Sequence, residues 1–363
     1  MTDTSILFQP LRVGALEFHN RVLMAPLTRS RAHADGTPKD IAVAYYRQRA
    51  SAGLIVSEAT QISPMGKGYI DTPGIHSDAH VEGWKPIIEA VHAAGGIIFC
   101  QLWHVGRISH TSLLPGGAQP VSASAIRANA KTFTTEGLTD TSEPMALDAD
   151  GIAATLDDFS AAARNAKAAG FDGVEVHGAN GYLLDQFLQD STNRREDGYG
   201  SSIENRQRLL REVLDRVQDV FSADRVGVRL SPLGQANDIS DSDPEATFSA
   251  AYRMLSDRKL AYLHVIEEFG QNTDGNQRAL LKRLRGLYEG IYIGNGGYNA
   301  ERAAAAIAGG DADAISFGRP FIANPDLPER FRIGAPLTEP DQNTFYGGDA
   351  TGYSDYPFLP LDH

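Results

Sequence analysis

The feature that most constrains the fold is an alternation, repeated along the chain, between short β-rich runs and Ala-rich amphipathic stretches. This alternation predicts strands and helices in turn, and therefore a parallel sheet with helical connections. The expected strands are 22–26, 54–58, 97–102, 173–177, 226–230, 262–266, 291–294 and 314–317. The clearest helices between them are 156–169, 203–220, 244–256 and 300–308.

Eight strand–helix units favour a closed (β/α)8 TIM barrel over an open doubly wound sheet. The open sheet is usually marked by G-x-G-x-x-G directly after its first strand, and that motif is missing after 22–26. Barrels often run past roughly 250 residues as one unit. We therefore expect a single α/β domain over residues 1–363.

Two insertions and the tail depart from the strand–helix alternation. Residues 12–18 form a short alternating run that suits a hairpin plugging the bottom of the barrel. Residues 109–150 form a long Gly-, Pro-, Ser- and Thr-rich excursion after the third strand, where it would overhang the C-terminal face as a flap or lid. The tail, 336–363, is expected to wrap the barrel without regular structure.

Composition excludes several classes of partner and site. The chain has 46 acidic and 33 basic residues, and a surface of that sign repels nucleic acid and anionic lipid headgroups. No run approaches the roughly 20 apolar residues of a membrane span, and residues 1–8 lack a signal-peptide pattern, so a cytoplasmic protein is expected. Cys100 is the single cysteine, which excludes an internal disulfide and a cysteine-ligated zinc or iron–sulfur site.

Polar side chains follow the predicted strands at the end where barrels place their catalytic residues. These strand-end residues are Thr28, Glu58, Ala59, Gln101, Trp103, His104, His177 and Arg229. A metal site would need more ligands than His177 and a neighbour such as His104 or Asp185, and no spacing such as H-E-x-x-H is present. No metal is expected.

His177, Asn180 and Tyr182 lie in V-E-V-H-G-A-N-G-Y, where the fourth strand gives way to a Gly-containing loop. Imidazole and amide donors can hold a carbonyl oxygen and stabilise negative charge on it, and a nearby phenol can deliver a proton. The residues alone leave a second interpretation open, in which these side chains satisfy loop backbone groups and cap the core.

Arg229, inside the apolar run V-G-V-R-L, needs an anionic or strongly accepting partner. That partner is either a carboxylate in a structural salt bridge or an electron-rich ring or phosphate. Farther on, I-G-N-G-G-Y and I-S-F-G-R-P end the seventh and eighth strands, where barrels commonly bind phosphate. Gly296, Gly297 and Gly318 permit close backbone approach there, and Arg319 can pair with phosphate oxygens.

Long motifs in order along nearly the whole chain resemble the old yellow enzyme family. They are M-A-P-L-T-R-S-R-A, Q-L-W-H-V-G-R, H-G-A-N-G-Y-L-L-D-Q-F-L, N-R-R-x-D-x-Y-G-x-S-I-E-N-R, F-G-R-P-F-I-A-N-P-D and F-Y-G-G. The family consists of FMN-containing (β/α)8-barrel ene-reductases. Its members take hydride from NADPH or NADH and reduce activated C=C bonds, and some also act on nitro compounds and nitrate esters.

The resemblance implies a set of contacts to a tightly bound, non-covalent FMN. Thr28 would bond the flavin carbonyl at the reactive edge, and Arg229 would face N1 and the C2 carbonyl. The remaining contacts would come from the backbone of Pro26 and Leu27, from Ala59 and Gln101 against the ring, and from Gly296, Gly297, Gly318 and Arg319 around the phosphate.

The resemblance also implies how the small-molecule partners, activated alkenes and NAD(P)H, are handled in a ping-pong cycle. His177 and Asn180 would bind the oxygen of the activating group. Tyr182 would protonate the α-carbon after flavin N5 gives hydride to the β-carbon. Trp103 and Tyr346 would line the pocket. The preferred nicotinamide, the physiological alkene and the choice between monomer and homodimer stay open.

Some positions depart from the family pattern or select within it. Thr28 occupies a position where one branch of the family has Cys. Asn180 occupies a position where other members have His. Ser201 stands where Gly is usual, so a positive φ there would cost about 1 kcal/mol. Lys131 replaces a flap Arg of some relatives, and the loop 267–276 matches poorly.

Three alternative functions are weaker. A larger flavin reductase with an iron–sulfur cluster would need more cysteines, and a Schiff-base aldolase would need a lysine at a strand end. A non-catalytic flavin or phosphate-ligand binder would have no use for a proton donor such as Tyr182.

Overall fold

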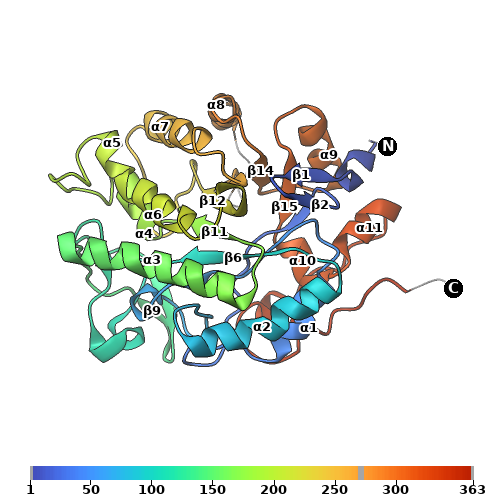
Figure 1. Ribbon diagram of the computed structural model, residues 1–363, viewed down its shortest axis with the longest axis horizontal. Helices are drawn as coiled ribbons and strands as arrows, with labels where there is room; N and C mark the ends of the chain where they lie inside the picture. Colours follow the sequence, from blue (N-terminus) through green and yellow to red (C-terminus); the bar gives the residue numbers. More distant parts are fainter. Residues whose placement is uncertain (1–2, 269–273, 361–363) are drawn as a thin grey trace.

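The computed structural model describes residues 3–268 and 274–360. Within them, parallel strands form a closed barrel with helices around it (Figure 1), which confirms the predicted (β/α)8 fold. In chain order the barrel strands are β3 (Val22–Met24), β4 (Ile55–Val56), β6 (Ile98–Trp103), β11 (Gly173–His177), β12 (Val226–Leu230), β13 (Tyr262–Ile266), β14 (Tyr292–Asn295) and β15 (Ala314–Phe317). The ring closes because β15 pairs with β3, and β6 pairs with both β4 and β11.

The second barrel strand is interrupted. The predicted strand 54–58 is wrong at its C-terminal end, because β4 stops at Val56 and a second segment, β5 (Thr60–Gln61), resumes the pairing with β6. The hydroxyls of Ser57 and Thr60 both donate to the Glu58 carbonyl, at 3.0 and 2.7 Å, in place of strand pairing. Glu58 and Ala59 therefore lie in a break of the barrel wall.

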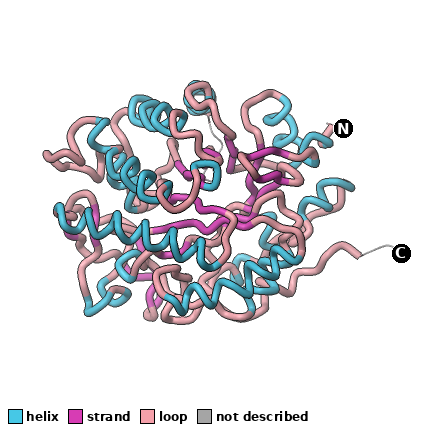
Figure 2. The backbone as a smooth tube through the Cα atoms, in the orientation of Figure 1, coloured by secondary structure: helices cyan, strands magenta, loops and turns pink. Residues whose placement is uncertain are grey.

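Helices surround the strands, which gather in the middle of the molecule in Figure 2. They are α1 (Ile41–Gln48), α2 (Asp78–Ala93), α3 (Ala149–Ala169), α4 (Leu183–Leu188), α5 (Ile203–Arg206), α6 (Arg208–Gln218), α7 (Pro244–Ser256), α8 (Gly275–Arg285), α9 (Ala300–Ala308), α10 (Arg319–Ala323) and α11 (Leu327–Ile333).

Two predicted helices differ from the structure in their bounds. The helix expected at 156–169 begins earlier, because Asp148 accepts a hydrogen bond from the Gly151 amide and caps the N-terminus. It ends as expected at Gly170, whose φ of 102° suits glycine. The helix expected at 203–220 is divided at Gln207 into α5 and α6 and ends at Gln218.

The N-terminal hairpin closes the bottom of the barrel, as predicted. It consists of β1 (Leu11–Val13) and β2 (Leu16–Phe18), which pair antiparallel. Its apolar residues join barrel residues in one buried cluster that includes Leu11, Val13, Phe18, Leu23, Val56, Phe99, Tyr262 and Ile293. Removing this apolar surface from water stabilises the closed end of the barrel.

The excursion 109–150 has a structure of its own. It contains a parallel pair, β7 (Val121–Ser122) with β10 (Met145–Ala146), and a hairpin of β8 (Lys131–Thr134) with β9 (Gly137–Asp140). The Thr132 hydroxyl donates to the Gly68 carbonyl, and the Ile70 amide donates to the Phe133 carbonyl at 3.0 Å. The hairpin is thereby attached to the segment that follows β5.

The C-terminal tail is held by three buried arginines. Arg29 and Arg31 donate to backbone carbonyls between Thr344 and Gly352, and Arg49 donates to carbonyls of α10 and of Tyr353. The expectation of a tail without regular structure is wrong at one turn, because Gln342–Thr344 forms a 3-10 helix. Carbonyl acceptors satisfy guanidinium donors that would otherwise be costly to bury.

Ser201 has a φ of 66°, which is the strained left-handed conformation that its position suggested. We predict that Ser201→Gly raises the free energy of unfolding by about 1 kcal/mol at most, because glycine adopts this φ without a Cβ clash. Ser202 is the matched control: it has a φ of −80° and caps α5 through the Asn205 amide. Ser202→Gly should lower stability slightly. Thermal midpoints measure both, and a lower midpoint for Ser201→Gly would contradict the strain argument.

Candidate active site

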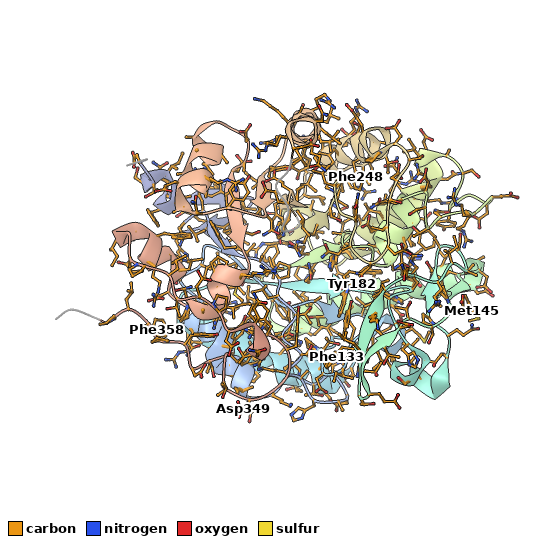
Figure 3. The ribbon with its side chains drawn as sticks, turned by 180° about the vertical axis from the view of Figure 1, so that it is seen from behind. Phe133, Met145, Tyr182, Phe248, Asp349 and Phe358 are labelled. Carbon is orange, nitrogen blue, oxygen red and sulfur yellow. The ribbon has the colours of Figure 1, made fainter. Side chains whose placement is uncertain are left out.

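The three residues predicted at the fourth strand end do come together. His177 ends β11, Asn180 follows in the loop, and Tyr182 precedes α4. The Tyr182 ring meets the His177 ring edge to face, with centroids 5.2 Å apart, and meets Trp103 in the same way, also at 5.2 Å. Figure 3 shows Tyr182 in the middle of the molecule, whereas the labelled, exposed Phe133 lies on the flap hairpin.

Tyr69 is a site residue that the sequence did not reveal. Its hydroxyl lies 3.1 Å from the Tyr182 hydroxyl, and its ring stacks on Trp103. Tyr69 lies in the loop after β5, several residues beyond the strand end, whereas candidates from the sequence were sought at strand ends. The flap contacts of Gly68 and Ile70 hold its backbone on either side.

The loop that carries Asn180 is fixed from below. Asn180 has a φ of 60°, a conformation that Asn tolerates better than most residues. Its amide donates to Ser231 Oγ at 2.9 Å, and the next amide, of Gly181, donates to Asp185 Oδ2 at 2.9 Å. Its carbonyl accepts from Asn237 Nδ2 at 2.8 Å. These bonds hold the Asn180 backbone, and so fix the position from which its side chain extends.

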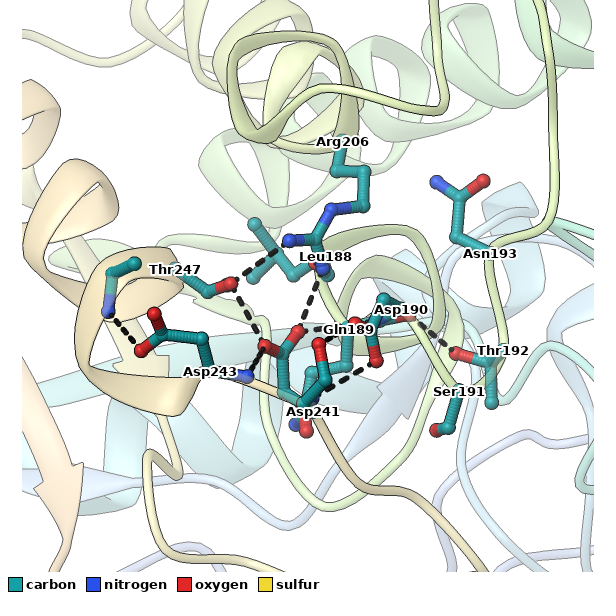
Figure 4. A network of polar contacts seen from close by, with 12 residues as sticks. Leu188, Gln189, Asp190, Ser191, Thr192, Asn193, Arg206, Asp241, Asp243 and Thr247 are labelled. Atoms are coloured by element: carbon teal, nitrogen blue, oxygen red, sulfur yellow. Dashed lines mark hydrogen bonds and ion pairs between the residues drawn. The ribbon is translucent and has the colours of Figure 1, made fainter.

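A buried network anchors the loop after β12 that supplies Ser231 and Asn237. In Figure 4, dashed lines join Arg206 to Asp241 and to Thr247; the two hydrogen bonds measure 2.6 Å and 3.0 Å. Arg206 also donates to the Leu188 carbonyl at the end of α4. The network therefore ties this loop to the helix that Tyr182 precedes.

Burial sets the protonation of the two titratable groups in this cluster. Burial, with a smaller contribution from the charge of Arg229, lowers the pKa of His177 to about 3, so its imidazole is neutral near pH 7. Burial raises the pKa of Tyr182 above its usual 10, so its phenol keeps its proton. Both groups are neutral hydrogen-bond donors in the physiological range.

Arg229 lies beside this cluster, because it pairs with His177 across β11 and β12. Its Nη2 donates to Asn295 Oδ1 at 2.9 Å, so its direct partner is an amide and not a carboxylate. Burial lowers the pKa of its guanidinium to about 10, which leaves it charged at pH 7. This geometry argues against a structural salt bridge as the role of Arg229. It favours the other interpretation, in which Arg229 contacts an electron-rich ring.

Beneath Arg229, polar side chains from four strands form a chain of hydrogen bonds, here called the barrel polar layer. Gln101 Nε2 donates to Glu175 Oε1 at 2.8 Å, Glu175 Oε2 lies 2.9 Å from His264 Nδ1, and His264 Nε2 lies 2.7 Å from Ser316 Oγ. Burial opposes ionisation of Glu175, but the hydrogen bond from His264 and the charge of Arg229 leave the pKa of its carboxyl below the usual value. Burial also lowers the pKa of His264, so a neutral imidazole meets a carboxylate.

The loop after β3 and the break after β4 lie side by side. The Arg29 amide donates to Glu58 Oε2 at 3.1 Å, which holds the loop of Thr28 against the segment that contains Ala59. Burial raises the pKa of Glu58 to about 7. Thr28, with Pro26 and Leu27 before it, is half-buried at this edge of the barrel.

The two predicted phosphate loops differ in what surrounds them. Gly296 and Gly297 have φ values of 114° and 63°, and a Cβ on Gly296 would lie 2.6 Å from the Glu268 carbonyl oxygen. Their missing side chains thus admit Glu268, whose carboxylate pairs with Arg302 at 3.1 Å. Gly318 has more room, since a Cβ there would first meet Leu27 at 3.3 Å, and Arg319 beside it is exposed.

Two walls of the pocket are less enclosed. Tyr346 is 64% exposed, and its neighbour Gly347 bonds the Arg29 carbonyl at 2.9 Å. It lies close enough to raise the pKa of Tyr182 slightly, although burial is the main cause. The loop 267–276, which matches the family pattern poorly, includes Glu267. Its carboxylate accepts hydrogen bonds from Tyr292 and Tyr298 at 3.1 and 2.6 Å; residues 269–273 lie outside the described residues.

Within residues 3–268 and 274–360, no group of three His, Cys, Asp or Glu side chains is placed to hold a metal ion. In the same residues, none of the helices has the length and apolar character needed to cross a membrane.

The unpaired polar atoms of the site fit a flavin and an oxygen-bearing ligand. In the described part of the chain, Trp103 Nε1, His177 Nδ1, Asn180 Oδ1 and Arg229 Nε are buried and have no hydrogen-bond partner. Buried polar groups normally have partners, so such a cluster at the strand ends is typical of a binding site. A cationic donor beside neutral donors suits an electron-rich ring next to a carbonyl oxygen.

Asp185, fully buried behind the Asn180 loop, should make stability depend on pH. Burial raises the pKa of its carboxyl from 3.8 to about 7, so its stabilising protonation is complete below about pH 4 and is lost as pH rises through 7. Asp185→Asn cannot lose a proton. We predict that its thermal midpoint rises relative to that of the native chain between about pH 5 and about pH 8.

Asp157→Asn is the matched control, because Asp157 lies on the exposed face of α3. Its midpoint relative to the native chain should stay constant over the same pH range. A constant difference for Asp185→Asn as well would show that Asp185 ionises normally in the fold.

Comparison with known proteins agrees with this geometry. The model of the NADH:flavin oxidoreductase / NADH oxidase family matches residues 6–338. The chain is 45% identical to 12-oxophytodienoate reductase 1 of Oryza sativa subsp. japonica over 360 residues, which covers 97% of this chain and 93% of the relative.

Among solved structures, morphinone reductase in complex with tetrahydroNAD is 51% identical, with a TM-score of 0.94 and 98% of each chain covered. The old yellow enzyme homologue from Zymomonas mobilis is 49% identical, also with a TM-score of 0.94, covering 97% of this chain and 99% of that one. The chain therefore belongs to the NADH:flavin oxidoreductase / NADH oxidase family, the family of old yellow enzyme, and is an FMN-dependent NAD(P)H oxidoreductase.

Proposed function

We propose that this oxidoreductase is an ene-reductase, which reduces the C=C bond of alkenes conjugated to a carbonyl or nitro group. The observation that carries the proposal is the buried His177 imidazole, whose Nδ1 has no partner, next to the protonated hydroxyl of Tyr182. The side chain of Asn180 adds the N–H groups of its amide as a second donor. Two donors for an oxygen and one acid for a carbon are what addition of H₂ across an activated alkene requires.

His177 and Asn180 hold and polarise the oxygen of the activating group. Because the imidazole is neutral, it donates a hydrogen bond without transferring its proton to the substrate. Negative charge that develops on the oxygen as the β-carbon receives hydride is stabilised by both donors. FMN, when bound, would supply the two-electron chemistry that carries hydride from a nicotinamide to the alkene.

Tyr182 protonates the α-carbon. Its phenol is an acid throughout the physiological range, and its raised pKa means that the phenolate left behind needs support. The Tyr69 hydroxyl, 3.1 Å away, is placed to donate to that phenolate oxygen. Tyr69 therefore assists the acid, and Tyr182 itself touches the substrate.

The remaining predicted site residues complete the proposal. Thr28 and Ala59 would hold the flavin at its reactive edge, with the backbone of Pro26 and Leu27. Gln101 and Arg229 would hold its pyrimidine side, and its phosphate would be bound by Gly296, Gly297, Gly318 and Arg319. Trp103 and Tyr346 line the substrate space, over which the 109–150 flap forms a lid. NADPH or NADH would supply the hydride and would occupy the same pocket before the alkene; morphinone reductase has been solved in complex with tetrahydroNAD.

We predict that Tyr182→Phe separates the two half-reactions. The rate at which NAD(P)H reduces the flavin should stay within about twofold of the native rate. This rate is measured as the loss of the visible flavin absorbance in an anaerobic stopped-flow experiment. Reoxidation by a cyclic enone should slow by about 100-fold or more, because the general acid is removed.

Tyr69→Phe is the matched control, since it removes one hydrogen bond and leaves the acid. It should slow reoxidation by about tenfold at most. An unchanged enone rate in Tyr182→Phe would show that another group, or water, is the proton donor. A native protein that stays yellow with both nicotinamides would overturn the proposed function itself.

A further inference from the structure

We propose that Glu175 is a positioning residue that sets the reduction potential of the bound FMN, by orienting Gln101 and by placing a negative charge beneath Arg229. The inference rests on the proposed function in one respect, the position of the FMN pyrimidine ring at Gln101 and Arg229. It assigns a role to a buried carboxylate that the proposed reaction does not otherwise use.

The first step is the contact between Glu175 and Gln101. They are paired neighbours on β11 and β6, and Gln101 Nε2 donates to Glu175 Oε1 at 2.8 Å. This bond uses one amide hydrogen of Gln101 and fixes the plane of the amide. The other amide hydrogen and the Gln101 carbonyl oxygen are then left for a ligand above the layer.

The second step is the restraint on Glu175 from the opposite side. Its other oxygen lies 2.9 Å from His264 Nδ1, and His264 Nε2 lies 2.7 Å from Ser316 Oγ. Because the imidazole is neutral, Nδ1 carries its proton toward the carboxylate and Nε2 accepts from the serine hydroxyl. All members of the barrel polar layer are buried, so water does not compete for these bonds.

The third step is electrostatic. Arg229 lies one inward-facing position above Glu175, since it pairs with His177, two residues along β11. The other polar groups facing Glu175 are Gln101, neutral His264 and the Tyr262 phenol, which keeps its proton because burial raises its pKa. Glu175 is therefore the negative charge that partly cancels the field of Arg229, and in this buried setting the effect is weakly screened.

The expected sign follows from the charge of the reduced cofactor. Reduced flavin gains negative charge near the ring edge assigned to Arg229, so a cation there favours reduction and an anion opposes it. Removing the Glu175 charge removes the opposition and exposes the full charge of Arg229. Both changes make FMN easier to reduce.

The test is the reduction potential of FMN in the holoenzyme, measured by anaerobic titration against a dye of known potential. For Glu175→Gln, which keeps the shape and removes the charge, we expect the ratio of reduced to oxidised FMN at a fixed potential to rise about tenfold. For a two-electron couple this is a shift of about 30 mV in the positive direction. Glu175→Asp, which keeps the charge but withdraws it from Gln101, should fall between the native enzyme and Glu175→Gln.

Two controls separate this effect from a loss of packing. Glu82→Gln makes the same chemical change on the exposed face of α2 and should leave the potential unchanged. Ser316→Ala removes the last bond of the layer but keeps the Glu175 charge, so its potential should stay nearer the native value than that of Glu175→Gln. If Glu175→Gln does not retain FMN, the test rests on Glu175→Asp. The inference then requires that the reduction potential of FMN in Glu175→Asp be more positive than in the native enzyme.

An unchanged potential in a folded, FMN-loaded Glu175→Gln, or a shift no larger than that of Ser316→Ala, would overturn the inference. Either result would leave the proposed function intact if the native enzyme still reduced an enone. Conversely, a native enzyme that bleaches with NAD(P)H but fails to reduce an enone would overturn the proposed function, while the effect of Glu175 on the potential could still be measured.

Discussion

One carboxylate and one guanidinium are enclosed near the axis of a closed barrel, and this burial constrains much of what surrounds them. Neither Glu175 nor Arg229 can be solvated by water, so each needs hydrogen bonds from other strands. Glu175 accepts hydrogen bonds from Gln101 and His264, and Arg229 donates one to Asn295. Because these partners come from different strands, the layer is complete only when the ring is closed and in register.

The barrel interior is thus ordered in three levels. The N-terminal hairpin and inward-facing apolar residues seal the bottom, the barrel polar layer lies above them, and the strand ends with their unpaired donors lie at the top. The apolar end supplies the hydrophobic stabilisation, and the polar layer gives the top its fixed geometry and charge. Burial makes the charged groups of the polar layer energetically costly. It also keeps His177 neutral and Tyr182 protonated, because it lowers the pKa of His177 and raises that of Tyr182.

Much of this was accessible from the sequence, for identifiable reasons. The alternation of strands and helices predicts the barrel. In a barrel the catalytic residues are expected at the strand ends, and this rule identified His177, Gln101 and Arg229 as candidates. A single backbone expectation, positive φ at Ser201, is also confirmed. These successes share a cause: each depends on local pattern or on position along one strand.

What the sequence missed depends on the approach of distant segments. Glu175 and His264 lie inside apolar runs, and nothing local indicates that they meet across the barrel. Tyr69 reaches Tyr182 only because the flap holds its loop, and Gly296 faces Glu268 through a contact between two loops. The interruption of the second strand after Val56 depends on side-chain hydrogen bonds that replace strand pairing. Such features arise from tertiary register, which a one-dimensional pattern does not contain.

The central claim is that two donors hold the substrate oxygen while hydride and proton add to different carbons, and isotopic labelling of the product tests it most directly. A cyclic enone is reduced once with NAD(P)H deuterated at the transferred position in ordinary water, and once with unlabelled NAD(P)H in deuterated water. The account predicts deuterium on the β-carbon in the first product, deuterium on the α-carbon in the second, and an intact carbonyl in both. Deuterium on the carbonyl carbon of an alcohol, or both labels on the same carbon, would contradict it.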